Sequence, residues 1–594
     1  MKIKYIDGKR FSRGIRAGAK KVVEHQEHLN KINVFPVPDA DTGTNMAATM
    51  KTVVDNLSHD TDSIEHTSTK IADSALEGAR GNSGVILAQF FYGLAKGLRK
   101  HRKVNTEQFA AAADAAQEHA YRALSKPKDG TILTVIRDWA ENIKSNARKH
   151  LDFDELLTHS LEAARRSLER TRTKLEALRT ANVVDSGAQG FVYMLEGITH
   201  FIKTGHIRDN KAAEPVAFEE VARTEVLPET ITFRYCTECL IEGKNIDHPR
   251  LRAQIETLGD SLVLAGSEKR ARLHIHTNEP AKVFKIAHAY GDLLQQKADD
   301  MLKQYIVSHH PHPPIAIVAD SGCDLPEETL DKYGIQLIPV RVAFGNSAYI
   351  DKITITADIF YEMLDTEPHH PKTSQPSPAD FKNTYSFLLS YYDSIISIHL
   401  PAAASGTYQN AVNAAREFPD RKISVIDSKS LSVTFGLIVE KAAELVAAGK
   451  THDEVVEEVT RFTRQTQIFV NIPSLKYLMR SGRVSITKGV IAKLLNLKPI
   501  LNLDERGVPK ICGKSFSDKG AIAKVLDLTT RFAQSKKNPR FVITHANALE
   551  TAKYYCAEIR KRFNIEHINI LPASPTLGAH AGNGAAAIGL SWSE

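Results

Sequence analysis

The sequence predicts a multidomain protein in which an all-α domain precedes a small α+β module and a larger α/β domain. Three observations predict this order. Apolar residues recur at helical spacing up to about residue 205, alternate as in strands between residues 231 and 277, and form short apolar runs that end in polar residues from residue 315 onward. The length of 594 residues leaves room for several domains, since a domain takes roughly 100–200 residues.

The amino-terminal domain, residues 1–205, is expected to be helical throughout. Apolar residues within 87–98 and 156–178 are three or four positions apart, with charged or polar residues between them, as in amphipathic helices. Segments rich in Gly, Asp and Thr separate the helices, at 36–45, 80–84, 127–131 and 185–190. In a helical bundle such loops gather at one end, where they form a site. The polar residues 206–229 are expected to be a linker.

The middle module, residues 230–308, has a different pattern. Residues 231–241 and 272–277 alternate as strands do, whereas 249–258 and 280–290 are expected to be helical. Together they predict a small α+β domain. The next segment, residues 309–314, reads His-His-Pro-His-Pro-Pro and is expected to be a stiff linker, because proline cannot continue a helix.

Residues 315–594 are expected to form an α/β domain. Short apolar runs are followed by polar residues, and helical stretches separate most of them; the runs lie at 315–318, 395–398, 423–426 and 541–543. Such runs are typical of buried parallel strands. Ligands of these sheets bind at the carboxyl ends of the strands, so we expect a binding site there.

The composition excludes several classes of protein. The 77 basic and 70 acidic residues are interspersed and give a net charge of only +7, so we expect no nucleic-acid partner. Five scattered cysteines do not form a disulfide framework. No apolar stretch approaches the roughly 18 residues of a membrane span, so we expect a cytoplasmic protein without a transmembrane segment. A transient contact with a membrane surface stays open.

The densest polar cluster lies between residues 33 and 46. Asp39 and Asp41 are flanked by prolines that fix the backbone, and paired carboxylates suit a hard cation such as Mg²⁺. The residues that follow supply hydroxyls and backbone amides just ahead of a helix: Thr42, Gly43, Thr44 and Asn45. Phosphate oxygens bind well at such a helix start. Taken alone, the pattern fits a calcium-binding turn or a helix cap equally well.

Three more loops repeat this chemistry. Residues 78–84 interrupt a helix and restart it, and residues 127–131 and 184–190 each open another helix. Their glycines let the backbone approach a phosphate group, and each new helix presents free amides to it. Four such helix starts in one helical domain are hard to explain as caps alone.

On these motifs, residues 1–205 resemble the ATP-binding subunit of dihydroxyacetone kinases, the DhaL family, and more closely its branch in bacterial fatty acid kinases. The resemblance implies a helical bundle or barrel and two Mg²⁺ ions that bridge the phosphates of ATP. It implies that the metal is held by Asn33, Asp39 and Asp41, with Asp39 and Asp41 catalytic. It implies an ATP site made of Thr42, Gly43, Thr44, Asn45, Gly81, Asn82, Ser83, Gly130, Thr131, Asp185, Ser186 and Gly187. Ala40 and Asp129 depart from the Gly and Glu expected in that branch.

The middle module holds a candidate metal site. His274 and His276 are two apart in a predicted strand and therefore share a face, so one cysteine of a paired strand would complete a zinc site with them. Cys236 and Cys239 are three apart, so either one alone is a ligand or a turn brings in both. The alternative is a buried polar pair with two core thiols. The segment is similar to the middle region of the fatty acid kinase ATP-binding protein, which implies zinc on Cys236, His274 and His276, in a structural or a regulatory role.

Residues 315–594 resemble the DegV family, whose members bind fatty acids. The resemblance runs through 318–321, 372–378, 404–409, 474–484 and 577–584. It implies a two-lobed α/β domain in which several donors hold a fatty-acid carboxylate at the edge of an apolar tunnel. The implied substrate-binding residues are Thr373, Ser374, Ser405, Gly406, Thr407, Arg483 and His580, with Arg483 and His580 also catalytic. Turn chemistry and helix capping are the alternative roles for these hydroxyl residues.

The order of the segments implies a natural fusion of two proteins. We expect an ATP-dependent fatty acid kinase that phosphorylates the carboxylate of a fatty acid held in its own DegV-like domain, giving acyl phosphate for lipid synthesis. The expected partners are the fatty acid, an acyltransferase that uses acyl phosphate, and a second copy of the chain in a homodimer. The alternatives are a phosphotransferase like dihydroxyacetone kinase and a non-catalytic lipid-binding or nucleotide-sensing protein.

Overall fold

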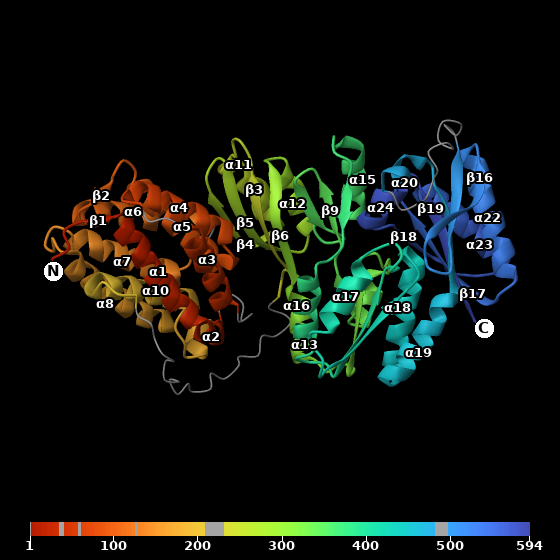
Figure 1. Cartoon of the computed structure of the whole chain (residues 1–594), viewed down its shortest axis with the longest axis horizontal. Helices are drawn as coiled ribbons and strands as arrows, with labels where there is room; N and C mark the ends of the chain where they lie inside the picture. Colours follow the sequence, from red (N-terminus) through yellow and green to blue (C-terminus); the bar gives the residue numbers. More distant parts are fainter. Residues whose placement is uncertain are drawn as a thin grey trace. The chain divides into compact units, whose positions relative to one another are not determined.

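The structure, a computed structural model, describes residues 2–34, 41–57, 61–124, 127–207, 231–481 and 497–593. The chain divides into two compact units. The first comprises Met1–Glu279 with Ile286–Asp299, and the second comprises Pro280–Lys285 with Asp300–Glu594. Figure 1 shows the elements of both units, coloured along the chain from red to blue.

The amino-terminal part of the first unit is helical, as predicted. Its helices are α1 (Gly8–Glu24), α2 (Gln26–Lys31), α3 (Thr42–Asn56), α4 (Ile64–Gly78), α5 (Gly81–Gly97), α6 (Thr106–Ala123), α7 (Ile132–Asn146), α8 (Phe153–Lys174), α9 (Glu176–Thr180) and α10 (Ser186–Thr204). Strand β1 (Ile6–Asp7) pairs antiparallel with β2 (Lys103–Val104). Helix α1 packs along α10 (Figure 1), and Phe91, Trp139 and Phe191 are almost fully buried in the core of the bundle.

Local sequence sets where these helices begin and end. Ser63 caps α4 by accepting a hydrogen bond from the amide of His66, and Asn105 caps α6 through a reciprocal capping box. Such a cap stabilises a helix by about 1 kcal/mol. The helical pattern predicted over 156–178 is divided in the structure, because Leu175 is extended (φ −110°, ψ 141°) and separates α8 from α9.

The middle module packs on these helices within the first unit. Its sheet has the strand order β4-β5-β3-β6, formed by β3 (Tyr235–Glu242), β4 (Gly259–Gly266), β5 (Arg270–Thr277) and β6 (Asp292–Asp300). Helix α11 (His248–Ile255), the 3-10 turn η2 (Glu256–Leu258) and α12 (Pro280–His288) connect the strands. Leu240, Val263 and Ala265 belong to the same hydrophobic core as the helical domain. The α+β prediction is confirmed.

The second unit begins with a parallel sheet. After α13 (Met301–His309), its strand order is β13-β12-β7-β8, formed by β7 (Ile315–Asp320), β8 (Gln336–Ile338), β12 (Ser394–His399) and β13 (Lys422–Asp427). Around these strands lie α14 (Glu327–Lys332), α16 (Pro378–Leu388), α17 (Thr407–Ala415), α18 (Ser432–Ala447), α19 (His452–Phe462) and η3 (Thr463–Gln465). Three of the four predicted apolar runs are therefore neighbouring parallel strands.

Two further sheets complete the second unit. A small one has the order β10-β9-β11, from β9 (Arg341–Phe344), β10 (Ser347–Ile350) and β11 (Lys372–Ser374), with α15 (Ala357–Thr366) beside it. The larger has the order β16-β15-β14-β19-β17-β18, from β14 (Thr466–Asn471), β15 (Lys498–Leu503), β16 (Pro509–Ser515), β17 (Lys537–His545), β18 (Asn569–Pro572) and β19 (Ala586–Ser593). Its helices are α20 (Leu475–Ser481), α22 (Asp518–Gln534), α23 (Leu549–Phe563) and α24 (Pro575–Ala581).

The fourth apolar run differs from the prediction. Residues 541–543 lie in β17 of the larger sheet, parallel to β18 but antiparallel to β19, and not beside the strands of the other three runs. A buried strand carries the same apolar sequence whichever way its neighbour runs, so the local pattern did not distinguish the two sheets. No helix within the described residues is long and apolar enough to span a membrane.

Candidate active site

Three of the predicted loops meet at the starts of α3, α5 and α10. A Cβ atom on Gly81 would lie 2.5 Å from Nδ2 of Asn45, and one on Gly187 would lie 2.8 Å from Oγ of Ser83. The backbones approach this closely only because glycine has no side chain there, and Gly81 also has a positive φ of 58°. The amino ends of these helices therefore lie side by side and present backbone amides to a shared space.

The start of α7 joins this group through Asp185. Oδ1 of Asp185 accepts a hydrogen bond from the amide of Ala188, and the amide of Ile132 also donates to this carboxylate. Burial raises the pKa of Asp185 to about 6, although the two amides oppose the rise. Oγ of the adjacent Ser186 donates to the carbonyl of Leu29, which ties this loop to α2.

Asp41 directly precedes α3, and its backbone carbonyl accepts a hydrogen bond from the amide of Asn45 at 2.8 Å. Within the described residues its carboxylate makes no capping hydrogen bond, so its oxygens are not used by the helix that they precede. Thr44 is held from α2, because its amide donates to Oδ1 of Asn30 at 3.0 Å. Asn33 is buried. Asp39 lies outside the described residues.

The loop at 127–131 is held by its own hydrogen bonds. The amide of Gly130, at φ 90°, donates to Oγ1 of Thr134, and Oγ1 of Thr131 donates to the carbonyl of Lys128. Asp129 accepts a hydrogen bond from Arg137 at 3.1 Å. The loop thus places Ile132 against Gly187, 3.5 Å from a Cβ at that position.

The middle module brings Cys236, His274 and His276 together. One ligand atom from each residue lies within 4.8 Å of the others. Cys236 pairs with His276 across β3 and β5, and the strand alternation puts His274 on the same face. Cys239 is fully buried and pairs with Leu273, so of the two cysteines only Cys236 joins this cluster.

The donor set fits a zinc ion. Nδ1 of His274 lies 3.0 Å from Oε1 of Glu238, and Nδ1 of His276 lies 3.5 Å from Oδ1 of Asp260. Histidine ligands of metals commonly donate their second ring N–H to such a carboxylate. Nε2 of His274 is buried and has no hydrogen-bond partner among the described residues, which leaves a lone pair for a metal. Burial and the charge of Glu238 raise the pKa of the Cys236 thiol, and a bound cation would offset both.

Glu238 is a functional candidate that the sequence analysis missed. Its side chain is 2% exposed, and its Oε1 accepts the backbone amide of Gly81 at 2.7 Å. Oε2 accepts Nη2 of Arg272 at 3.2 Å. Burial opposes ionisation, but the hydrogen bond with His274 and the guanidinium of Arg272 outweigh it and hold the pKa of Glu238 well below its usual range. Strand alternation, which places Cys236 and Glu238 on one face, was the signal available in the sequence.

Charged residues of β6 lie near the same place. Nζ of Lys297 is 2.5 Å from Oδ2 of Asp299. Burial opposes the charge of Lys297, but Asp299, Glu238 and Cys236 outweigh it and raise its pKa. Burial raises the pKa of Asp299, and the charge of Asp41 adds to the rise. The middle module thus places the carboxylate of Asp299 close enough to Asp41 for their charges to interact, and that of Glu238 on the amide of Gly81.

The second unit contains an apolar cavity beside the larger sheet. It encloses about 690 Å³ of empty space, which includes solvent at its open mouth. Its walls are almost wholly apolar, and they include Leu431, Ile468, Val470, Leu501, Leu577 and Ala587. Such walls suit a hydrocarbon chain.

Polar side chains border this cavity. His580 on α24 is one of the lining residues, and its Nε2 lies 3.1 Å from Oγ1 of Thr373 on β11. His545 also lines the cavity, and burial lowers its pKa, which favours a neutral imidazole. The structure therefore brings Thr373 and His580, which are 207 positions apart in the sequence, into one pair.

The loop around Ser405 lies beside the strand that carries Thr373. A Cβ on Gly406 would overlap the side chain of Gln375, and Oγ of Ser405 lies 2.8 Å from Oγ1 of Thr407. Ser374 is exposed. The Ser405 loop is not among the residues that line the apolar cavity. Arg483 lies outside the described residues.

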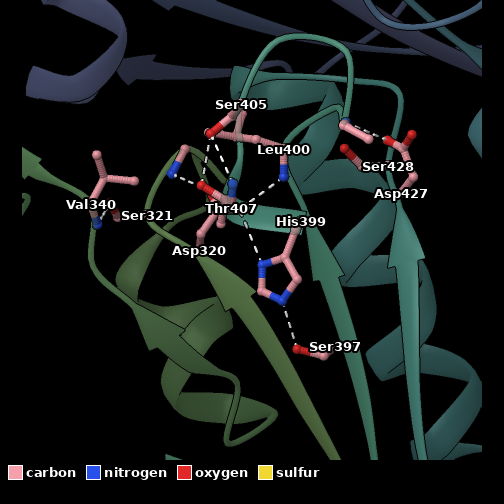
Figure 2. A network of polar contacts seen from close by, with 12 residues as sticks. Asp320, Ser321, Val340, Ser397, His399, Leu400, Ser405, Thr407, Asp427 and Ser428 are labelled. Atoms are coloured by element: carbon pink, nitrogen blue, oxygen red, sulfur yellow. Dashed lines mark hydrogen bonds and ion pairs between the residues drawn. The ribbon is translucent and has the colours of Figure 1, made fainter. Parts of the chain in front are cut away.

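A buried network fixes the Ser405 loop (Figure 2). Oδ2 of Asp320 accepts the amide of Leu400 at 2.8 Å and lies 3.2 Å from Nδ1 of His399, whose Nε2 lies 2.7 Å from Oγ of Ser397. Asp320, His399 and Ser397 are all fully buried. These three side chains therefore stabilise the fold, and the hydroxyl of Ser397 is not open to a substrate as a nucleophile. The network anchors the chain where β7 and β12 end.

A second buried carboxylate supports the helix that carries His580. Oδ2 of Asp351 accepts the hydroxyl of Thr576 on α24 at 2.6 Å and that of Ser321 at 2.7 Å. Burial raises the pKa of Asp351 to about 6. The nearby Lys352 makes an ion pair of 2.9 Å with Asp324. The end of β7 and the start of α24 are thereby connected.

Three family models match successive parts of the chain. Residues 36–200 match the DAK2 domain, residues 232–307 match the FakA-like middle domain of fatty acid kinases, and residues 314–592 match the DegV family of uncharacterised proteins. The first two are domains of a kinase family, which implies nucleotide use. The chain thus joins a DAK2 domain, a FakA-like middle domain and a DegV-family domain in one polypeptide.

Two curated relatives show how far the likeness extends. The chain is 36% identical over 327 residues to protein YloV of Bacillus subtilis, a match that covers 53% of this chain and 59% of the relative. It is 37% identical over 316 residues to an uncharacterized protein of Staphylococcus saprophyticus, which covers 50% of this chain and 56% of the relative. The chain therefore spans less than two thirds of the length of these relatives.

Solved structures of two DegV proteins are also similar. One is the fatty acid-binding DegV family protein from Thermus thermophilus, with 27% identity and a TM-score of 0.45, covering 47% of this chain and 100% of that one. The other is DegV, a fatty acid binding protein from Bacillus subtilis, with 29% identity and a TM-score of 0.44, covering 47% of this chain and 100% of that one.

Proposed function

We propose that this protein is an ATP-dependent fatty acid kinase that phosphorylates the carboxylate of a fatty acid bound in its own DegV-family domain. The observation that carries the proposal is the pairing, in one chain, of kinase-family domains with a domain whose apolar cavity is bordered by a threonine–histidine pair. The product is an acyl phosphate, which an acyltransferase of lipid synthesis would consume.

The phosphate end of the proposed site rests on the four converging helix starts. Amides at the amino ends of α3 and α5 favour the phosphates of ATP. The starts of α7 and α10, with Thr131 and Asp185, would lie near the nucleoside. The amide of Gly81 is taken by Glu238, so Asn82 and Ser83 carry the phosphate contacts of that loop.

Asp41 is the described residue that fits a magnesium ligand. Its carboxylate makes no capping bond in the described part of the chain, and carboxylate oxygens are the ligands that Mg²⁺ prefers. Asp39 and Asn33 complete the proposed set. When bound, Mg²⁺ would neutralise charge on the phosphates and orient them for transfer.

The acceptor end rests on the apolar cavity and its polar border. The hydrocarbon chain would occupy the cavity, while the carboxylate accepts hydrogen bonds from Thr373, Ser405 and His580. Ser374, Gly406, Thr407 and Arg483 are proposed to complete this border. A carboxylate oxygen then bonds to the γ-phosphorus of ATP as the bond to the β–γ bridging oxygen breaks, and ADP leaves. Positioning and charge neutralisation do most of the work in such a transfer.

The test is ATP-dependent formation of acyl hydroxamate on the purified chain, with hydroxylamine as the trap for acyl phosphate. The variants are Asp41→Asn and, as a matched control on the same helix, Asp55→Asn, which is exposed. We expect hydroxamate from the unaltered chain and from the control, and at least a hundredfold less from Asp41→Asn, as for loss of a charge-stabilising group. Consumption of dihydroxyacetone instead would support a triose kinase. Bound lipid without any hydroxamate formation would contradict the kinase proposal and support a non-catalytic lipid carrier or nucleotide sensor.

A further inference from the structure

Glu238 connects two sites that the sequence keeps far apart. Its Oε1 accepts hydrogen bonds from the backbone amide of Gly81, at the start of α5, and from Nδ1 of His274, in the metal cluster. The distances are 2.7 and 3.0 Å. Arg272 holds the other oxygen of the carboxylate. One buried carboxylate is therefore shared by the candidate metal site and the candidate phosphate loop.

On the metal side of this connection, one ring nitrogen of His274 already has a hydrogen-bond partner. Nδ1 of His274 lies 3.0 Å from Oε1 of Glu238 and 4.0 Å from Sγ of Cys236, while its buried Nε2 has no partner among the described residues. A metal ion on Nε2 would fix both the tautomer and the orientation of the ring, with the proton on Nδ1. Without a metal, the same ring can carry its proton on Nε2 and then donates nothing to Glu238. A metal ion on Nε2 would therefore hold the ring in the tautomer that donates to Glu238.

The loop side of the connection leaves little freedom for adjustment. Gly81 has a positive φ, and a Cβ at this position would overlap the side chain of Asn45 on α3. The amide that donates to Glu238 is thus part of the place where α3 and α5 meet. If the carboxylate turns, the start of α5 loses the partner of a buried amide, and the loop must rearrange to give that amide another.

We propose that a divalent metal ion at Cys236, His274 and His276 sets the shape of the phosphate-binding loop through Glu238, so that nucleotide affinity depends on the metal. Glu238 is a positioning residue, because its carboxylate contacts His274 and the amide of Gly81 and acts through them. This inference rests on the proposed nucleotide site and adds a regulatory role to the metal centre. By linkage, the nucleotide must strengthen metal binding by the same factor.

The test measures the dissociation constant of ADP with Mg²⁺ in excess, on the full chain loaded with zinc and on the chain stripped by a zinc-selective chelator. We expect stripping to weaken ADP binding about tenfold, equivalent to about 1.4 kcal/mol, and restored zinc to reverse the loss. In Glu238→Gln the effect of stripping should fall to less than twofold. Glu242→Gln, an exposed change on the same strand, should respond to stripping as the unaltered chain does.

A second measurement needs no variant and therefore holds even if Glu238→Gln does not fold. Zinc affinity of the unaltered chain, measured with and without ADP, should rise with ADP by the same tenfold factor. Equal ADP affinity with and without zinc would overturn the coupling while leaving the proposed kinase intact. Loss of coupling in Glu242→Gln as well as in Glu238→Gln would also overturn the role of Glu238. Absence of ADP binding in both metal states would overturn the coupling and the proposed nucleotide site together.

Discussion

Thr373 allows a test of the acceptor site at the scale of a single hydroxyl group. Its Oγ1 lies 3.1 Å from Nε2 of His580, at the border of the apolar cavity, and valine has the same branched shape without the hydroxyl. We predict that Thr373→Val weakens fatty acid binding about tenfold, because a hydrogen bond to a charged group contributes roughly 1.5–3 kcal/mol and part of the loss is compensated by water. The measurement is displacement of a fluorescent fatty acid.

The matched control for this change is Thr366→Val. Thr366 is exposed at the end of α15, and its hydroxyl donates to the carbonyl of Glu362 within the same helix. The control should bind fatty acid as tightly as the unaltered chain. Equal affinity of the Thr373→Val variant and the control would remove Thr373 from the acceptor site.

Asp185 gives a pH-dependent prediction. Burial raises its pKa in the folded chain from 3.8 to about 6, so the protonated form is favoured by folding. Its contribution to stability is complete below about pH 4 and is lost as the pH rises through about 6. Asp185→Asn keeps an acceptor for the amide of Ala188 and cannot ionise. The free energy of unfolding of the unaltered chain, relative to this variant, should therefore fall by about 2 kcal/mol between pH 4 and pH 7.

Urea titrations of both proteins across this pH range, followed by helical circular dichroism, would measure the difference. The comparison removes the contribution of other groups, since they titrate in both proteins. A constant difference between pH 4 and pH 7 would contradict a raised pKa at this position.

At the scale of an element, the position of α24 determines where the side chain of His580 lies. The helix ends at Gly582, where φ is 78° and a Cβ would overlap the ring of Tyr477 on α20. We predict that Gly582→Ala lowers stability by more than the roughly 1–2 kcal/mol that positive φ alone costs. Either Tyr477 or the end of α24 must move, so fatty acid binding should weaken as well. Thermal unfolding and lipid displacement measure the two effects.

Gly449 is the control for this prediction, because it has nearly the same backbone angle in open surroundings. Its φ is 77°, and no atom of the described residues lies within 4 Å of a Cβ built there. Gly449→Ala should show the cost of the backbone angle alone, with unchanged lipid binding. If the two variants lose the same stability and keep the same lipid affinity, contact with Tyr477 does not position α24.

The elements themselves were largely predictable from local periodicity. The helical spacing in 87–98 corresponds to α5, and the alternation in 272–277 corresponds to β5, because one face of each element is buried and the sequence records that face. The sheet to which 541–543 belongs was not predictable in this way. Its neighbour β19 follows more than forty residues later, and no local pattern records such a pairing.

The residues of the candidate site could likewise be predicted only where a local sequence pattern indicated them. Strand alternation predicted the pair His274 and His276 but left the choice of cysteine open, and the resemblance to the fatty acid kinase middle region implied Cys236. The structure brings these three residues together. Glu238 stood in the same strand motif and was passed over, since its partner Gly81 is 157 positions away. Asp351 was missed for the same reason, because Thr576 is 225 positions distant. Residues that act through distant partners leave no trace in local pattern.

At the scale of the whole molecule, each unit holds one half of the proposed reaction. The converging helix starts and the metal cluster belong to the first unit, and the apolar cavity with Thr373 and His580 belongs to the second. Covalent connection keeps acceptor and donor at an effective concentration on the order of millimolar, provided that the connection permits their encounter. A free carrier protein would have to be present at a comparable concentration to compete.

This connection predicts that phosphoryl transfer occurs within one chain at low protein concentration. The rate per chain should then be independent of dilution, because the encounter is intramolecular. Mixing Asp41→Asn with the double variant Thr373→Val/His580→Ala should restore little hydroxamate formation at nanomolar concentration. Since the donor of one chain must then meet the acceptor of another, the restored rate should rise with the square of concentration. Full restoration at nanomolar concentration would instead mean that a stable dimer delivers the phosphoryl group from one protomer to the fatty acid of its partner.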